Sequence, residues 1–251
     1  MTSGHIEFEG AFGDTLSAKV DQAEGETIGC ALFAHCFTCS KNLKAVGHIT
    51  KSLAERGITT LRFDFTGLGQ SDGEFANTNF SSNVQDLVAA ASYMENSLEA
   101  PSLLVGHSLG GAAVLHAAHN LESVKAVATI GAPFDPAHVK ENFGMKLDEI
   151  EETGEAEVTL AGRPFKIKKQ FLDDLESAGS KGKISALNRA LLIMHAPFDK
   201  TVGIDNASTL YSRAKHPKSF ISLHEADHLL TNQRFSKYTG NIIAQWSKLY
   251  L

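Results

Sequence analysis

The sequence predicts an α/β fold, with a mostly parallel central sheet flanked by helices and a small inserted cap. Apolar segments of strand length alternate with segments of helical periodicity along most of the 251 residues, and this order produces a parallel sheet covered on both faces. Several apolar segments are nearly continuous, as expected for strands buried on both faces. A polar stretch after residue 134 interrupts the alternation and predicts the cap.

The expected strands are short apolar runs, most of which lead into distinctive loops. Residues 5–20 alternate apolar and polar side chains around Gly13–Asp14, which predicts a β-hairpin. Later apolar runs predict the central strands, each with its following loop; they cover residues 27–37, 58–65, 102–108, 124–134, 189–202 and 218–230.

The expected helices show apolar residues three or four positions apart. Between residues 42 and 57 these side chains share one side, and Gly57 marks the end. Serines at the start of the run 80–96 can cap that helix. The remaining expected helices cover residues 110–121, 204–215 and 239–251.

The alternation divides the chain into a core and a cap. Residues 1–134 and 189–251 are predicted to form the core, and residues 135–188 the cap insertion. Inside the cap we expect a small hairpin that turns at Gly162–Arg163 and a helix over residues 170–178. Since the cap overlies one end of the sheet, its side chains are expected to shape a substrate pocket.

Composition and charge exclude several function classes. The formal net charge is −6 and the basic residues are scattered, so we expect no nucleic-acid partner. No run approaches the roughly 18 apolar residues that a membrane helix needs, and the N-terminal residues lack the apolar region of a signal peptide. These features predict a cytoplasmic protein without a membrane partner.

The three cysteines, Cys30, Cys36 and Cys39, do not form a disulfide framework. Cys36 and Cys39 make a C-x-x-C pattern, which occurs in redox sites but there opens a helix in a small domain. A zinc site would need a second ligand pair, which the sequence lacks. We interpret the two residues as half-buried thiols in a loop, with a redox role as the alternative, and we expect neither a metal nor another cofactor.

The segment Gly106-His107-Ser108-Leu109-Gly110 matches G-x-S-x-G and lies between a predicted strand and a predicted helix. In this context the pattern is typical of a nucleophilic serine on a sharp turn. Glycines two residues to either side leave room for the turn, and the helix start offers free N–H groups to developing negative charge. Ser108 is therefore the candidate nucleophile; a purely structural glycine turn is the alternative.

A serine nucleophile needs a base, and the base needs an orienting acid. Loops at the carboxyl ends of parallel strands meet at one edge of the sheet. His228 lies in the last such loop and is the candidate base, and Asp199 in the preceding loop is the candidate acid. Asp135 follows a strand one step earlier and is the rival acid, whereas Asp227 adjoins the base and is expected to face away.

Two other histidines near the expected site, His107 and His195, fit the role of the base less well. His107 adjoins the serine and is expected to point elsewhere, and His195 is expected to shape a loop. An acyl transfer also needs donors for the oxyanion. The expected donors are the backbone N–H groups of Leu109, directly after the nucleophile, and Phe37, in the loop after an early strand.

The chain order Ser108, Asp199, His228, with each residue in a loop after a strand, resembles that of the α/β-hydrolase superfamily. Residues 64–71 also resemble the D-x-x-G-x-G-x-S turn of its esterases. The segments AHCFTCSK, FANTNFSSNVQDL and GAPFDPAHV resemble the hydrolase half of bacterial proteins that fuse an α/β hydrolase to an OsmC-like domain. The cap is similar to that of cinnamoyl and feruloyl esterases.

The resemblance implies a carboxylesterase (EC 3.1.1) that cleaves small to medium acyl or aryl esters through an acyl-enzyme, needs no cofactor and acts on a small-molecule substrate. In relatives an OsmC-like domain is fused or associated. A thioesterase, an acyltransferase, a perhydrolase and a non-catalytic acyl-binding protein remain alternatives. One position departs from the family: Cys36 replaces the usual glycine, which predicts backbone strain at Cys36 and sensitivity to thiol reagents.

Overall fold

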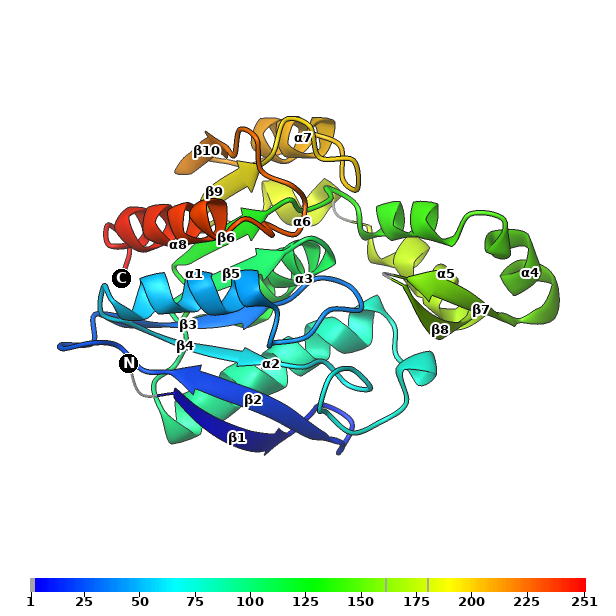
Figure 1. Ribbon diagram of the computed structural model, residues 1–251, viewed down its shortest axis with the longest axis horizontal. Helices are drawn as coiled ribbons and strands as arrows, with labels where there is room; N and C mark the ends of the chain where they lie inside the picture. Colours follow the sequence, from blue (N-terminus) through cyan, green and yellow to red (C-terminus); the bar gives the residue numbers. More distant parts are fainter. Residues whose placement is uncertain (1–2, 161, 180) are drawn as a thin grey trace.

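The computed structural model describes residues 3–160, 162–179 and 181–251. Its main sheet has eight strands in the order β1-β2-β4-β3-β5-β6-β9-β10, and β7 pairs with β8 in a separate two-stranded sheet (Figure 1). The strands are β1 (Ser3–Glu9), β2 (Thr15–Asp21), β3 (Gly29–Ala34), β4 (Ile58–Phe63), β5 (Leu103–His107), β6 (Ala126–Ile130), β7 (Glu155–Leu160), β8 (Arg163–Lys168), β9 (Ala190–His195) and β10 (Lys218–Ser222).

The helices lie between these strands along the chain, as the alternation predicted. The α-helices are α1 (Lys44–Ala54), α2 (Phe80–Ser97), α3 (Leu109–Ala117), α4 (Lys146–Thr153), α5 (Lys169–Ala178), α6 (Lys181–Ser185), α7 (Asp205–Arg213) and α8 (Gln233–Ser247). The 3-10 helices are η1 (Phe75–Asn77), η2 (Ala118–Asn120) and η3 (Pro136–Phe143).

The sheet is parallel from β4 through β10, and β2 runs antiparallel to both of its neighbours, β1 and β4. The expected N-terminal hairpin is present, with β1 paired to β2 in the register Ser3↔Asp21 to Glu9↔Thr15. The predicted fold class is therefore confirmed.

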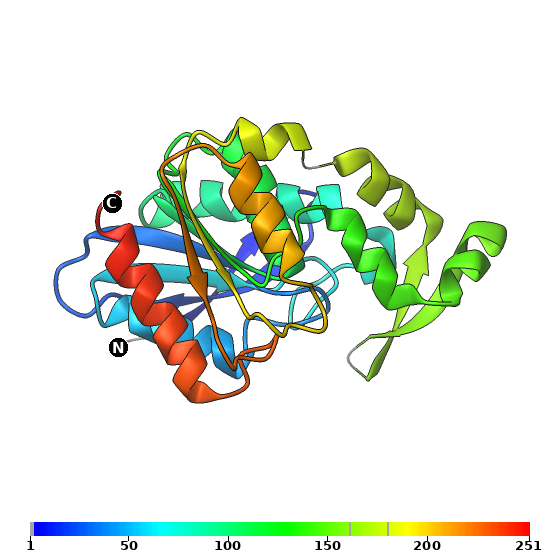
Figure 2. The ribbon, with the colours of Figure 1, turned by 90° about the horizontal axis from the view of Figure 1, so that it is seen from above.

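Two hydrophobic layers cover the sheet because successive strand residues point to opposite faces. In β3, Leu32 packs into one layer with α2 and α3, and Phe33 packs into the other with α1 and α8. Helices α1 and α8 lie side by side on their face of the sheet (Figures 1 and 2). Burial on both faces explains why the central strands show no polar alternation in sequence.

The polar stretch 135–188 contains η3, α4, the β7–β8 hairpin, α5 and α6, and most of it projects beyond the sheet (Figures 1 and 2). The expected hairpin and the helix near residues 170–178 are both found there, but Arg163, expected in the turn of the hairpin, is the first residue of β8 and pairs with Leu160. Aromatic contacts join this segment to the core: the ring centroids of Phe75 and Phe165 are 5.1 Å apart. The division into core and cap at residues 134 and 189 stays a prediction.

No helix within residues 3–160, 162–179 and 181–251 is long and apolar enough to cross a membrane. The cytoplasmic location stays a prediction.

Candidate active site

Ser108 occupies the turn between β5 and α3, and its backbone has φ of +56°. A positive φ is unfavourable for a residue with a side chain and is found where a functional turn is held by its surroundings. The neighbouring glycines supply the space. A Cβ atom on Gly106 would lie 2.4 Å from the Gly110 carbonyl oxygen, and one on Gly110 would lie 2.3 Å from the His35 carbonyl oxygen. Neither position accepts a larger residue without backbone movement.

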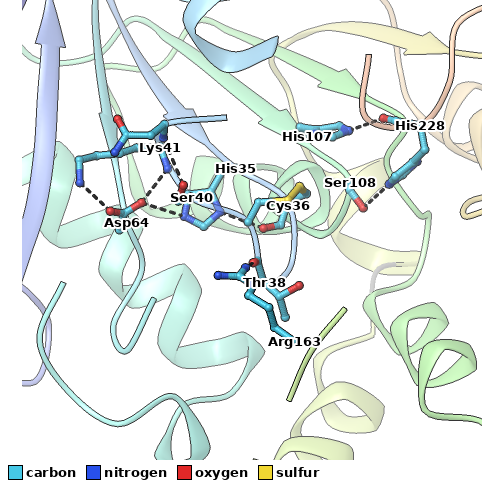
Figure 3. The surroundings of a disulfide bond; sticks show 12 residues. His35, Cys36, Thr38, Ser40, Lys41, Asp64, His107, Ser108, Arg163 and His228 are labelled. Carbon is cyan, nitrogen blue, oxygen red and sulfur yellow. Dashed lines mark hydrogen bonds and ion pairs between the residues drawn. A yellow bond between two sulfur atoms is a disulfide. The ribbon is translucent and has the colours of Figure 1, made fainter. Parts of the chain in front are cut away.

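The structure brings Ser108, His228 and Asp199 together. The Ser108 hydroxyl lies 2.9 Å from Nε2 of His228, as Figure 3 shows. Nδ1 of His228 lies 2.7 Å from Oδ2 of Asp199. Because the carboxylate can only accept, Nδ1 carries the proton, and Nε2 is free to accept the proton of the serine. The arrangement is a nucleophile, a base and an orienting acid within hydrogen-bond reach of one another.

Asp199 is held as a carboxylate by several donors. Burial alone would raise the pKa of Asp199, but hydrogen bonds from His228 and from the N–H groups of Thr201 and Val202 outweigh it and lower the pKa below its ordinary value. An ionised Asp199 therefore remains available to stabilise a protonated His228.

The rival acid, Asp135, and the neighbour of the base, Asp227, each accept hydrogen bonds within their own loops. Asp135 accepts a hydrogen bond from the N–H of Ala137 at the start of η3. Asp227 accepts from the backbone N–H of Thr231, within its own loop. His195 donates to the carbonyl of Val202 at 2.7 Å and so fixes the loop that carries Asp199, as expected.

His107 has a role that the sequence did not reveal. Its Nε2 donates to the backbone carbonyl of His228 at 2.7 Å, and the two rings lie 5.1 Å apart (Figure 3). Burial, together with the nearby His228, lowers the pKa of His107 to about 3, so the ring is neutral at pH 7. A neutral, buried donor fixes the backbone of His228. The one feature of the sequence that could have indicated this role is the position of His107 directly before Ser108, at the end of an apolar strand.

The pKa of His107 predicts a dependence of stability on pH. Between pH 6.5 and 3 the unfolded chain binds a proton that the folded protein does not, so the free energy of unfolding falls as the pH falls, by roughly 1 kcal/mol per pH unit from this group. His107→Asn keeps a donor for the His228 carbonyl but cannot be protonated. We expect its free energy of unfolding, measured in urea at pH 7, 5.5 and 4.5, to fall less steeply than that of the wild type.

The matched control for this prediction is His224→Asn, since His224 is exposed. This variant should lose stability with falling pH as steeply as the wild type does. An unchanged slope in His107→Asn would contradict the lowered pKa of His107.

The loop after β3 corrects the interpretation of the two nearby cysteines. Cys36 and Cys39 form a disulfide, with their Cα atoms 5.3 Å apart, so they are not the free thiols that the sequence suggested (Figure 3). Cys30 alone is a free thiol within the described residues, and it is buried. The sensitivity to thiol reagents was expected from a free thiol at Cys36, and this disulfide form has no such thiol.

Backbone strain in this loop lies at Thr38 and not, as expected, at Cys36. The N–H of Cys39 donates to the carbonyl of Cys36 at 3.0 Å, which closes a four-residue turn, and Thr38 has φ of +61° in its third position. Turns of this kind favour glycine in that position, because a β-branched residue is strained there. We call residues 36–39 the disulfide turn.

The two residues expected to bind the oxyanion line the same cleft as Ser108. Within the described part of the chain, neither Phe37 nor Leu109 has a backbone N–H that donates to a protein acceptor. The ring of Phe37 packs among aromatic residues of the core and the cap, with Phe171 at 5.5 Å and Phe75 at 5.7 Å between ring centroids. The side chain is therefore anchored while the N–H remains available.

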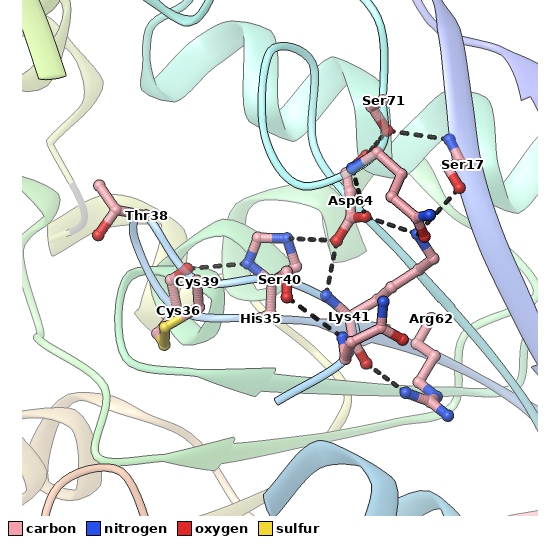
Figure 4. Close-up of polar contacts among 12 residues, drawn as sticks. Ser17, His35, Cys36, Thr38, Cys39, Ser40, Lys41, Arg62, Asp64 and Ser71 are labelled. Atoms are coloured by element: carbon pink, nitrogen blue, oxygen red, sulfur yellow. Dashed lines mark hydrogen bonds and ion pairs between the residues drawn. A yellow bond between two sulfur atoms is a disulfide. The ribbon is translucent and has the colours of Figure 1, made fainter. Parts of the chain in front are cut away.

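A buried polar network lies beside the disulfide turn (Figure 4). The side chain of Lys41 is only 1% exposed; its Nζ lies 2.6 Å from the carboxylate of Asp64. Asp64 also accepts from the N–H groups of Lys41 and Gln70, which fixes the glycine-rich turn after β4. His35 donates from Nδ1 to the carbonyl of Cys36 at 2.8 Å. The disulfide turn thus adjoins a rigid network.

The cleft above Ser108 has a volume of about 300 Å³. Its walls come from the disulfide turn, the β6 loop, η3 and the hairpin, and most of the side chains are apolar. The polar exceptions include His138, Asn142 and Thr201. In the part of the chain that the structure describes, no group of three or more His, Cys, Asp or Glu residues could hold a metal ion.

Comparison with known families fits this geometry. Residues 32–163 match the model of the serine aminopeptidase S33 family of α/β hydrolases. The chain belongs to this family. It is a hydrolase of the α/β-hydrolase fold and resembles serine esterases.

Solved structures extend the likeness of this hydrolase to the whole chain. The esterase domain of a Rhodothermus marinus protein is 47% identical to it and superposes with a TM-score of 0.83, over 100% of this chain and 99% of that chain. Est1E of Butyrivibrio proteoclasticus, solved with ferulic acid, is 20% identical, with a TM-score of 0.84 over 96% of this chain and 98% of that chain, which shows a shared fold.

Among curated proteins, mouse palmitoyl-protein thioesterase ABHD10 is 34% identical to the hydrolase over 110 residues, 43% of this chain and 35% of ABHD10. The chain spans between 28% and 66% of the length of the curated proteins that it matches. The resemblance to fusions with an OsmC-like domain stays a prediction, because these matches do not bear on it.

Proposed function

We propose that the protein is a serine carboxylesterase that cleaves small to medium acyl or aryl esters through an acyl-enzyme. One observation carries the proposal: Ser108, His228 and Asp199 are joined by hydrogen bonds of 2.9 and 2.7 Å at the floor of an apolar cleft. This geometry lets a serine hydroxyl lose its proton as it attacks. The similarity to the Rhodothermus marinus esterase domain supports the same chemistry.

The proposed mechanism has two halves. Ser108 Oγ attacks the ester carbonyl, Nε2 of His228 takes the hydroxyl proton, and the N–H groups of Phe37 and Leu109 hold the oxyanion. The tetrahedral intermediate expels the alcohol, which receives the proton from His228 and leaves an acyl group on Ser108. His228 then removes a proton from water, which attacks the acyl group and releases the acid. Asp199 stabilises the charged imidazole in both halves.

The direct test is trapping of the nucleophile. A fluorophosphonate should attach to one residue, and tryptic mass spectrometry should place the label on Ser108. The label should be absent after denaturation, because the unfolded serine has no base. A native protein that takes no label would contradict the proposal and favour a non-catalytic acyl-binding protein.

Cleft size predicts the acyl preference. A volume of about 300 Å³ is at the small end for ligand pockets. We expect kcat/KM for p-nitrophenyl esters to be highest from acetate to hexanoate and to fall by about tenfold or more for palmitate, because a long chain must leave the cleft. Hydrolysis of methyl ferulate tests whether aryl esters are substrates. A maximum at palmitate would contradict this assignment of the substrate class.

A thioesterase is the second candidate, and the similarity to ABHD10 favours it. The same side chains can attack an oxygen ester or a thioester. Comparison of kcat/KM for p-nitrophenyl butyrate and butyryl-N-acetylcysteamine separates the two functions. Acyl transfer to added alcohols and peroxide-dependent halogenation test the acyltransferase and perhydrolase alternatives in the same assay series.

A further inference from the structure

The Cys36–Cys39 disulfide lies where a reaction at sulfur would reach the site. Both cysteines line the cleft that holds Ser108. Cys36 is buried and Cys39 is half-buried, so Cys39 is the more accessible residue of the two. Figure 3 shows the disulfide beside the Cys36 backbone, on the side nearer to Ser108. A small reagent that enters the cleft by the route of the substrate therefore reaches this disulfide.

The disulfide closes the turn that presents the Phe37 N–H. It joins the first and fourth residues of that turn, with Phe37 second and Thr38 third. The strained φ of Thr38 favours opening of the turn. The disulfide opposes that opening, together with the bonds from His35 to the Cys36 carbonyl and from Arg163 to the Thr38 carbonyl.

We propose that the Cys36–Cys39 disulfide is a redox-sensitive control site, opened by a dithiol reductant, that sets the rate of hydrolysis through the geometry of the disulfide turn. The inference rests on the proposed function, because it assigns Phe37 as an oxyanion donor. Reduction frees the turn, Thr38 relaxes toward negative φ, and the Cys36–Phe37 peptide, which carries the Phe37 N–H, moves away from Ser108.

The chemistry is thiol–disulfide exchange. A thiolate of the dithiol attacks Sγ of Cys39, the S–S bond breaks, and Cys36 leaves as a thiolate that takes up a proton. The second thiol of the reductant then attacks the mixed disulfide and releases Cys39. The dithiol is oxidised by two electrons to its cyclic disulfide, and the protein gains two thiols. The reverse exchange, with an oxidised dithiol, restores the closed turn.

Cys30 provides the control. Burial and the nearby Glu99 raise the pKa of the Cys30 thiol to about 12, so it stays protonated and unreactive at neutral pH. The experiment compares wild type with Cys30→Ala, before and after treatment with dithiothreitol, and counts thiols on a denatured aliquot. Wild type should change from one thiol to three, because the chain has three cysteines.

We expect reduction to lower kcat for p-nitrophenyl butyrate by about 10-fold to 100-fold with little change in KM, because a donor to the oxyanion acts mainly in the transition state. Reoxidation should restore the rate, and Cys30→Ala should respond as wild type does. The double variant Cys36→Ser, Cys39→Ser should have the low rate in both conditions. An unchanged kcat in protein with three counted thiols, or a native disulfide that dithiothreitol does not open, would overturn the inference.

Thr38→Gly tests the route through the turn. Glycine accepts a positive φ without strain, so the turn should stay closed more often after reduction. The ratio of oxidised to reduced kcat should therefore be several-fold smaller than in wild type; an equal ratio would overturn the inference. The proposed function fails separately, if Ser108→Ala retains its ester hydrolysis.

Discussion

Ser108→Ala is expected to lower kcat for p-nitrophenyl butyrate by about 10⁴-fold to 10⁶-fold and to leave the protein folded. The attacking oxygen is lost, and the remaining site can only bind the substrate and polarise its carbonyl. The free energy of unfolding should change by less than about 1 kcal/mol, because among the described residues the side chain of Ser108 forms a hydrogen bond with His228 alone. Steady-state kinetics and urea denaturation measure the two effects.

Ser177→Ala is the matched control, since Ser177 is exposed on α5 and donates only to its own helix. It should keep the wild-type kcat. A Ser108→Ala protein with more than about a hundredth of the wild-type rate would show that another residue is the nucleophile.

Lys41→Met is expected to cost about 3–5 kcal/mol of the free energy of unfolding. Methionine keeps the apolar stem of lysine but removes the cation from the fully buried carboxylate of Asp64. That carboxylate keeps its backbone N–H donors but loses its buried counter-ion, which is unfavourable. For a chain of this size the melting temperature should fall by roughly 6–20 °C.

Lys51→Ala is the comparison, because Lys51 forms an exposed ion pair with Glu55 at 3.9 Å. It should change the stability by well under 1 kcal/mol. The double variant Lys41→Met, Asp64→Asn should cost less than the sum of its single variants, since the two residues interact directly. Additive costs would contradict a coupled buried pair.

The sequence was sufficient for features that depend on local pattern and chain order. The positions of Ser108, Asp199 and His228 followed from a strand–turn–helix context and from the rule that parallel strands end at one edge of the sheet. The sheet and the cap hairpin followed from periodicity, because burial on one or two faces leaves a regular mark on the sequence.

Other features depend on which distant residues come within a few ångströms of each other, and no local pattern records that. The Cys36–Cys39 pair looked like two thiols because C-x-x-C spacing allows a disulfide without requiring it. No pattern in the sequence marks Lys41 as buried, and only the fold places it against Asp64. His107 was set aside as the base because it adjoins Ser108, and no local pattern records its bond to the backbone carbonyl of His228, 121 positions away.

The hydrogen bond from Arg163 to the Thr38 carbonyl links the tip of the cap hairpin to the disulfide turn. Any swing of the hairpin that widened the mouth of the cleft would break this bond. The hairpin could then not be open for a bulky ester and hold the disulfide turn in place at the same time. Each turnover of such an ester would require the hairpin to close again before the reaction. Bulky esters would accordingly be limited by the closing step, and slim ones by the chemistry itself.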